Sequence, residues 1–160
     1  LDILLALVDS PIESIDAVGA PILSHREDIA NVRIRFANGC IANLTASRVT
    51  PTKKRKIRIF QDDAYMAIDY DRQSLEIFRR VELPQTRDSN QKFEVVRKRL
   101  RIKMEDKLQL EVDHFLDCIE NNIRPLVDGE AGAMALEAAV RISEQIHERS
   151  SGYFQRAVQD

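Results

Sequence analysis

Apolar and polar residues alternate over much of the chain before residue 105, which is typical of β-strands. The alternation is strict in Val32–Phe36. Asn38-Gly39, a pair well suited to a tight type I′ turn, and the return strand Cys40–Val49 follow it. Further strands are predicted at Ser14–Ile22, Lys56–Phe60, Ala64–Tyr70, Ser74–Val81 and Leu100–Met104. The stretch Glu82–Lys92 has no apolar period, which predicts a mobile loop.

Helical spacing replaces alternation at the two ends of the chain. Leu1–Val8 has the pattern of the end of a helix, which Asp9-Ser10-Pro11 stops because proline disfavours helical geometry in the residue before it. Two helical stripes lie near the C-terminus: Val112, Phe115, Leu116, Ile119 and Ile123, then Leu136, Ala139, Val140, Ser143 and Ile146. Val112, Phe115 and Leu116 are expected to form a buried helix face.

The order of elements is six or seven antiparallel strands followed by two helices. This order predicts an α+β fold with an open, mostly antiparallel sheet and helices packed on one face. The 160 residues are expected to form a single domain, 1–160. Because the chain begins without Met and directly on a helix-like segment, we expect it to be a fragment whose upstream part has been removed.

The two faces of the return strand bear on possible partners. Residues on one face are Cys40, Ala42, Leu44 and Ala46, and those on the other are Ile41, Asn43, Thr45 and Ser47. Neither face is strongly charged, although a half-exposed sheet is normally more polar outside. One face is expected to pack on helices and the other to be covered by a partner subunit, giving a homo-oligomer. A non-catalytic dimerisation or scaffold module is the alternative function.

Composition and charge argue against nucleic-acid binding, membrane association and metal binding. Hydrophobic residues make up 44% and charged residues 31% of the chain, as in a soluble globular protein. The net charge of −2 gives no reason to expect a nucleic-acid or anionic-membrane partner. The longest apolar run, Ile3–Val8, is too short to span a bilayer. Cys40 and Cys118 lack metal-site spacing, which indicates reduced thiols in a cytoplasmic protein and no metal site.

The stretch VDGEAGAMAL places Gly129 and Gly132 before a helical run, where a phosphate-binding loop could lie. The glycines follow neither the GxGxxG nor the GxxxxGK pattern, and Asp128 and Glu130 flank them. Two carboxylates repel a phosphate, whereas an acidic residue near a helix N-terminus caps free N–H groups. The stretch therefore predicts the start of a helix and not a nucleotide loop.

Six basic residues lie within SRVTPTKKRKIR, at Arg48, Lys53, Lys54, Arg55, Lys56 and Arg58. They suit a local anion site, for example for the diphosphate of a nucleotide sugar, but a solvated turn between strands accounts for them more simply. Nucleic-acid binding fits less well, because no aromatic residues are interleaved with them. Arg48, at the end of a strand, is the best site candidate of the six. No Ser/His/Asp set or acid–base pair of carboxylates is recognisable from spacing.

Several motifs in their order resemble the C-terminal domain of the Gfo/Idh/MocA oxidoreductases. They are LDILLALV, the hairpin with NLTASRV, the basic strand KIRIF and the closing segment EVDHFLDCIENNIRPLVDGEAGAMALEAAVRI. The resemblance covers essentially all of the chain, and the closing segment is its specific part. It implies a glyceraldehyde-3-phosphate-dehydrogenase-like domain that shapes a sugar pocket and mediates dimer or tetramer formation. It also implies an N-terminal Rossmann domain for NAD or NADP and hydride transfer from a sugar hydroxyl carbon.

The chain departs from the family's catalytic pattern, since it contains neither Glu-Lys-Pro nor GxGxxG. Asp2 matches only the last residue of the family's DxGxHxxD motif, so the catalytic His is expected upstream of Leu1. The fragment is therefore expected to lack catalytic and cofactor-binding residues and to be inactive alone. The likeness is greatest to members acting on nucleotide sugars such as UDP-N-acetylglucosamine. The expected substrate-binding residues are Asp2, Arg48, Lys53 and Arg55.

Overall fold

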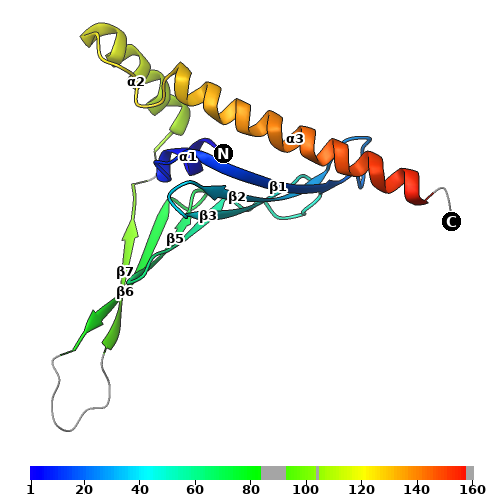
Figure 1. Ribbon diagram of the computed structural model, residues 1–160. Helices are drawn as coiled ribbons and strands as arrows, with labels where there is room; N and C mark the ends of the chain where they lie inside the picture. Colours follow the sequence, from blue (N-terminus) through cyan, green and yellow to red (C-terminus); the bar gives the residue numbers. More distant parts are fainter. Residues whose placement is uncertain (84–92, 104, 158–160) are drawn as a thin grey trace. The chain divides into compact units, whose positions relative to one another are not determined.

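The computed structural model describes residues 1–83, 93–103 and 105–157, with side chains as far as residue 149. The elements are α1 (Asp2–Leu7), β1 (Ile12–Ala20), β2 (Ile29–Phe36), β3 (Ile41–Ser47), β4 (Lys56–Phe60), β5 (Ala64–Asp69), β6 (Ser74–Glu82), β7 (Phe93–Arg101), α2 (Lys107–Asn121) and α3 (Gly129–Ala157) (Figure 1). All strand pairs are antiparallel. The α+β class with antiparallel strands is confirmed.

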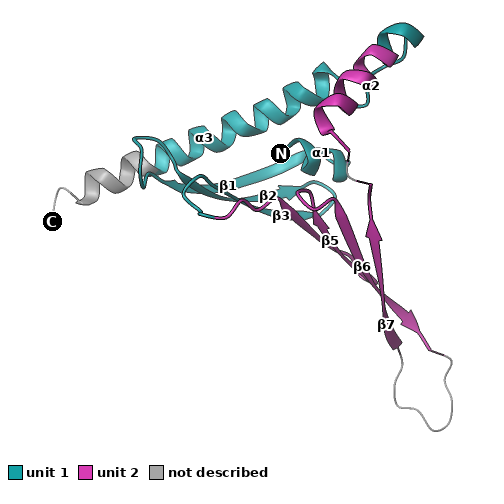
Figure 2. Cartoon of the chain, turned by 180° about the vertical axis from the view of Figure 1, so that it is seen from behind, with its two compact units in different colours: residues 1–51, 118–160 teal, residues 52–117 magenta. Residues whose placement is uncertain are grey.

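The residues group into two compact units, shown in Figure 2. The first consists of residues 1–51 and 118–160, and the second of residues 52–117. The strands accordingly form two sheets, one in the order β1-β2-β3 and one in the order β4-β5-β6-β7. Helix α2 begins in the second unit and ends in the first.

The first unit has its core between one face of the β1-β2-β3 sheet and the helices α1 and α3. Alternation in β2 directs Val32, Ile34 and Phe36 to this face, and the latter two are fully buried. The residues opposite Val32 and Ile34 on β3 are Leu44 and Ala42, which pack against the same core. The face of the return strand that contains Ala42 and Leu44 is therefore the one that packs on the helices.

Helix α3 approaches β1 closely at Gly19. A methyl group at this position would lie 2.8 Å from Ile146 Cγ2 and 3.0 Å from the carbonyl oxygen of Ile29. Contacts this short are sterically unfavourable, so only glycine lets the helix pack at this distance. Ile146 is 3% exposed as a result and completes the core.

The hairpin between β2 and β3 forms as predicted, but its turn is not type I′. The N–H of Gly39 donates to the carbonyl of Phe36 at 2.9 Å, so Ala37 and Asn38 are the central residues. Asn38 does not have the positive φ that a type I′ turn requires, and Gly39 takes the left-handed conformation at φ 85°. The Asn38 side chain accepts a hydrogen bond from the N–H of Cys40, which favours this longer loop.

The second unit is a meander of four strands whose last strand differs from the prediction. Strand β7 runs over Phe93–Arg101, whereas a strand over Leu100–Met104 was expected. Its residues are charged on both faces, which hides the alternation, and pairing with all of β6 determines its extent. The loop predicted at Glu82–Lys92 lies mostly outside the described residues, and Glu82 is the last residue of β6.

The predicted helical stripe of α2 has the expected period but not the expected burial. Val112, Phe115 and Leu116 are 45%, 58% and 51% exposed, while Cys118 is buried. A hydrophobic period alone shows which residues share a helix face, and it cannot show whether another element packs on that face.

Candidate functional site

Asp28, just before β2, is a buried carboxylate that organises the loop between β1 and β2. Its Oδ2 accepts hydrogen bonds from the N–H groups of Ile22, Leu23 and Ser24 at 2.8, 2.6 and 2.8 Å. Its Oδ1 accepts the Ser24 hydroxyl at 2.9 Å and lies 3.6 Å from Arg48 Nε. The backbone N–H groups stabilise the carboxylate and lower the pKa of Asp28 well below its usual range, although burial acts in the opposite direction.

The low pKa of Asp28 leads to a prediction about pH. An acid whose pKa is lowered on folding stabilises the protein above its unfolded pKa, about 3.9, and loses this effect as the pH falls through the folded value. Replacing Asp28 by Asn should lower Tm by a few degrees from pH 5 to 8. The difference from the native protein should shrink below about pH 4. Thermal melts over this pH range, with the exposed Asp62→Asn as control, would show it; a difference independent of pH would contradict it.

Arg48 lies at the end of β3, as expected. Its N–H donates to the carbonyl of Asp28 at 2.9 Å, and its guanidinium faces the Asp28 carboxylate. The Arg48 side chain nevertheless remains 64% exposed. The arginine is therefore oriented by a buried partner and still accessible to an anionic or hydroxylated ligand.

The other predicted substrate contacts are Lys53, Arg55 and Asp2. Lys53 and Arg55 are exposed and belong to the second unit, whereas Arg48 belongs to the first. Asp2 is the first residue of α1, where its carboxylate complements the helix dipole. Asp2 thus stabilises the start of α1, and its contact with a substrate stays a prediction, as it does for Lys53 and Arg55.

A polar surface covers the face of the β1-β2-β3 sheet turned away from the core; we call it the outer face. The sequence placed Asn43 and Thr45 together on this face of β3, but did not single them out as ligand contacts. Residues directly opposite one another on it form two rows, Asp16-Arg33-Asn43 and Val18-Asn31-Thr45. They surround a shallow concavity of about 270 Å³. The alternation that buries Val32 and Ile34 places Asn31 and Arg33 here, so the signal was present in β2.

The outer face combines all the groups that recognise hydroxyls. Asp16 offers a carboxylate, one oxygen of which lies 2.6 Å from Arg149 Nη1, while Arg33 offers donors and Asn43 both an acceptor and donors. The Thr45 hydroxyl donates to Asn31 Oδ1 at 2.9 Å, which orients both side chains. Such a set around a concavity can bind a polyhydroxylated molecule by several hydrogen bonds at once.

The stretch VDGEAGAMAL begins α3, which confirms the predicted helix start. Asp128 precedes the first helical residue, and its Oδ1 accepts the N–H of Ala131 at 2.9 Å. Arg124 forms ion pairs with Asp128 and Glu130. The Ala131 N–H and then the Arg124 guanidinium lower the pKa of Asp128, which caps the helix as a carboxylate.

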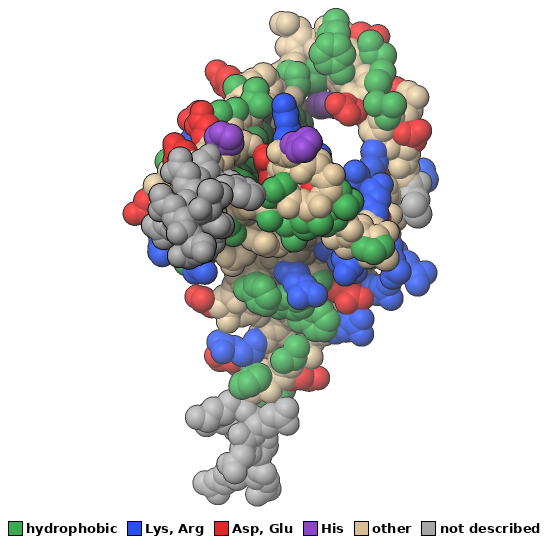
Figure 3. Space-filling view, turned by 90° about the vertical axis from the view of Figure 1, so that its right-hand side faces the viewer, with side chains coloured by type: hydrophobic (Ala, Val, Ile, Leu, Met, Phe, Trp, Pro, Cys, Tyr) green, Lys and Arg blue, Asp and Glu red, His purple; other side chains and the backbone are tan. Residues whose placement is uncertain are grey.

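Several classes of site are not found in the described part of the chain. No three His, Cys, Asp or Glu side chains gather there as metal ligands would. None of the helices in it combines the length and hydropathy of a membrane span. Cys40 is exposed, Cys118 is buried, and neither forms a disulfide with the other. Figure 3 shows Asp and Glu side chains among the Lys and Arg side chains on the face in view, with hydrophobic side chains exposed between them.

Comparison with known proteins identifies relatives over nearly the whole chain. Residues 2–153 match the family described as the oxidoreductase family, C-terminal alpha/beta domain, of the Gfo/Idh/MocA proteins. A UDP-N-acetylglucosamine 3-dehydrogenase of Acidithiobacillus ferrooxidans is 30% identical over 147 residues, which are 89% of this chain and 44% of that protein.

Solved structures agree with this match. The structure of the Acidithiobacillus ferrooxidans enzyme, GnnA, aligns with a TM-score of 0.79 at 28% identity, over 91% of this chain and 44% of that one. The WlbA dehydrogenase of Bordetella pertussis, in complex with NADH and UDP-GlcNAcA, shares the fold with a TM-score of 0.60 at 18% identity, over 92% and 40%. The chain spans less than half the length of these relatives. It belongs to the Gfo/Idh/MocA oxidoreductase family, as a C-terminal alpha/beta domain.

Proposed function

We propose that this chain is the substrate-binding and oligomerisation domain of a cytoplasmic, NAD(P)-dependent oxidoreductase that oxidises a hydroxyl of a nucleotide sugar such as UDP-N-acetylglucosamine. The observation that carries the proposal is the outer face, where Asp16, Arg33 and Asn43 present hydroxyl-recognising groups around one concavity. The relative of 30% identity, whose name states a UDP-N-acetylglucosamine substrate, supports the choice of sugar.

The nicotinamide cofactor would be bound by another part of the full-length protein. The chain contains no GxGxxG sequence and no Glu-Lys-Pro sequence, so its own residues do not fit a dinucleotide site of that kind. The chain's contribution is to bind and orient the sugar. We expect the chain alone to be inactive for this reason.

The substrate contacts lead to a prediction about kinetics. In the full-length enzyme, Asn43→Ala and Arg48→Ala should each raise KM for a UDP-sugar about fivefold and change kcat little, because one hydrogen bond is worth roughly 1 kcal/mol. Steady-state rates with NAD and NADP, monitored by cofactor absorbance, would measure this. The control is Lys54→Ala, because Lys54 is exposed and belongs neither to the outer face nor to the surroundings of Arg48. An unchanged KM in both variants would remove the outer face and Arg48 from the substrate site.

Asp2, Lys53 and Arg55 remain proposed substrate contacts and are tested in the same assay. If any of them contacts the substrate, its alanine variant should raise KM while the melting temperature stays constant. If the full-length protein oxidises no sugar or nucleotide sugar with either cofactor, the proposed activity fails altogether.

Oligomerisation is proposed through one face of the β4-β5-β6-β7 sheet in the second unit. The sequence instead placed it on the face of β3 that does not pack on the helices, which contains Asn43 and Thr45 of the outer face. The face of the β4-β5-β6-β7 sheet that contains Ile57 and Ile77 has apolar side chains on all four strands, with the charged residues Arg79, Lys98 and Glu94 among them on β6 and β7. Its outermost side chains Val81, Val96 and Leu100 are 42%, 46% and 37% exposed. Apolar surface of this kind is typical of an interface between copies, and we propose a homodimer or homotetramer. A full-length protein that sediments as a monomer at micromolar concentration would exclude this.

The same apolar face suits the alternative function, a non-catalytic dimerisation or scaffold module. The two functions differ in one measurement. A scaffold module forms the oligomer without any cofactor-dependent turnover of sugars, whereas the enzyme shows both.

A further inference from the structure

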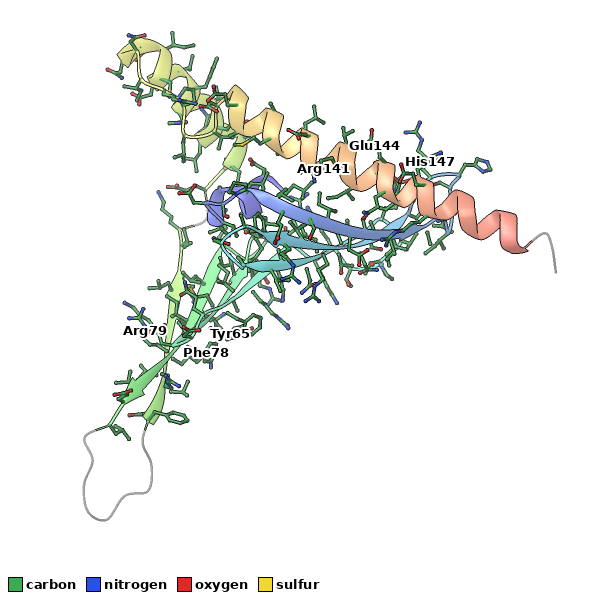
Figure 4. All side chains as sticks on the ribbon, in the orientation of Figure 1. Tyr65, Phe78, Arg79, Arg141, Glu144 and His147 are labelled. Atoms are coloured by element: carbon green, nitrogen blue, oxygen red, sulfur yellow. The ribbon has the colours of Figure 1, made fainter. Side chains whose placement is uncertain are left out.

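A row of aromatic side chains crosses the second unit's sheet on the face opposite to the apolar one. Phe60, Tyr65 and Phe78 lie directly opposite one another on β4, β5 and β6, so they share a face. Their ring centroids are 4.9 and 5.5 Å apart, with tilts of 30° and 32°. Figure 4 shows Tyr65 and Phe78 on this face. Phe60, at the end of the row, is 75% exposed, so one ring surface is open to a ligand.

Cationic side chains border this aromatic row. Arg97 continues the row on β7, with its guanidinium 5.5 Å from the Phe78 ring centroid and 2.8 Å from Glu76 Oε1. The next two rows along the strands are Arg58-Ala67-Glu76-Arg99 and Lys56-Asp69-Ser74-Arg101. The three rows together hold five cations and two carboxylates, so this face carries a net positive charge.

Arg58 is the cation best placed to receive an anion. It lies two residues before Phe60 on the same face of β4, a distance of about 7 Å along the strand. It forms no ion pair with another described residue, whereas Arg97 and Arg99 share Glu76, and Lys56 lies 3.3 Å from Asp69. Its neighbour across the strands is Ala67, whose small side chain leaves space beside the guanidinium.

We propose that this aromatic and cationic face binds uridine diphosphate. The base stacks on the open ring of Phe60, beside Tyr65, and the diphosphate is bound by Arg58 and Lys56. Base stacking on aromatic rings and charge-assisted hydrogen bonds from arginine are the two interactions such a ligand needs. Stacking tolerates any base, so the choice of uridine rests on the proposed function.

Titration calorimetry of the full-length protein with UDP tests this proposal. Phe60→Leu, which keeps an apolar side chain but removes the ring, should weaken UDP binding about tenfold. Arg58→Ala should weaken it by a similar factor and reduce its salt dependence. The matched control is Arg79→Ala, because Arg79 lies on the opposite face of the same sheet, as Figure 4 shows, and should leave UDP binding unchanged. Melting curves of the three variants check that each is folded.

Other outcomes separate this proposal from the proposed function. If native protein does not bind UDP, or if Phe60→Leu and Arg58→Ala bind it normally, the proposal is overturned while sugar oxidation can still stand. If UDP binds through these residues but no sugar is oxidised, the proposed activity fails and the nucleotide surface remains. A uridine oligonucleotide that binds this face far more tightly than UDP would overturn the proposal in favour of a single-stranded nucleic-acid partner.

Discussion

Replacing Phe36 by alanine is expected to lower the free energy of unfolding of the first unit by about 3–5 kcal/mol. Phe36 is fully buried at the end of β2, among the residues that hold α1 and α3 to the sheet. The loss combines the transfer free energy of the ring with the cavity that remains, since neighbouring side chains relax only in part. Urea unfolding followed by far-UV circular dichroism measures it.

The control for Phe36 is the same change at Phe60, which is 75% exposed in the other unit. Phe60→Ala removes one aromatic contact, worth about 1 kcal/mol, and creates no cavity. Because the two residues lie in different units, fits that allow two transitions assign each loss to its unit. If both variants lost the same free energy of unfolding, Phe36 would not be part of the core of the first unit.

The sequence predicts the centre of the first sheet well because two independent signals coincide there. Strict alternation in Val32–Phe36 gives the buried face, and Asn38-Gly39 gives the reversal. The turn type differs because the sequence pair permits more than one loop, and the Asn38 side chain bonded to Cys40 favours the longer one. Strand β7 was mislocated because its charged residues carry no alternation and its pairing with β6 is a tertiary effect.

The candidate site was only partly predictable, for reasons that differ between residues. Arg48 could be found because a cation at a strand end stands out in the sequence. Asp28 could not, since its partners are the backbone N–H groups of Ile22 to Ser24, which leave no side-chain pattern. The aromatic row was hidden because Phe60, Tyr65 and Phe78 are spread over three strands, and only the register brings them together.

The second large effect is expected at Gln145, whose side chain pairs with the free edge of β1. Gln145 Oε1 accepts the N–H of Ala17, and its Nε2 donates to the carbonyl of Ile15 at 3.0 Å. Arg149 adds a hydrogen bond from Nη1 to the Ala17 carbonyl at 3.2 Å. Strand β1 is at the edge of its sheet, so these side chains from α3 satisfy backbone groups that would otherwise lack partners.

Gln145→Ala is therefore expected to lower the free energy of unfolding by about 2–3 kcal/mol. Two hydrogen bonds are lost, and because Ala17 is fully buried, its N–H is left without a partner away from water. Urea unfolding measures the loss, and amide hydrogen exchange should show faster exchange at Ala17. Glu144→Ala is the matched control, since Glu144 precedes Gln145 and points away from β1 (Figure 4). If both variants unfold at the same urea concentration and Ala17 exchanges at its native rate, the contacts from α3 do not stabilise this edge, and packing at Ile142 and Ile146 alone holds the helix to the sheet.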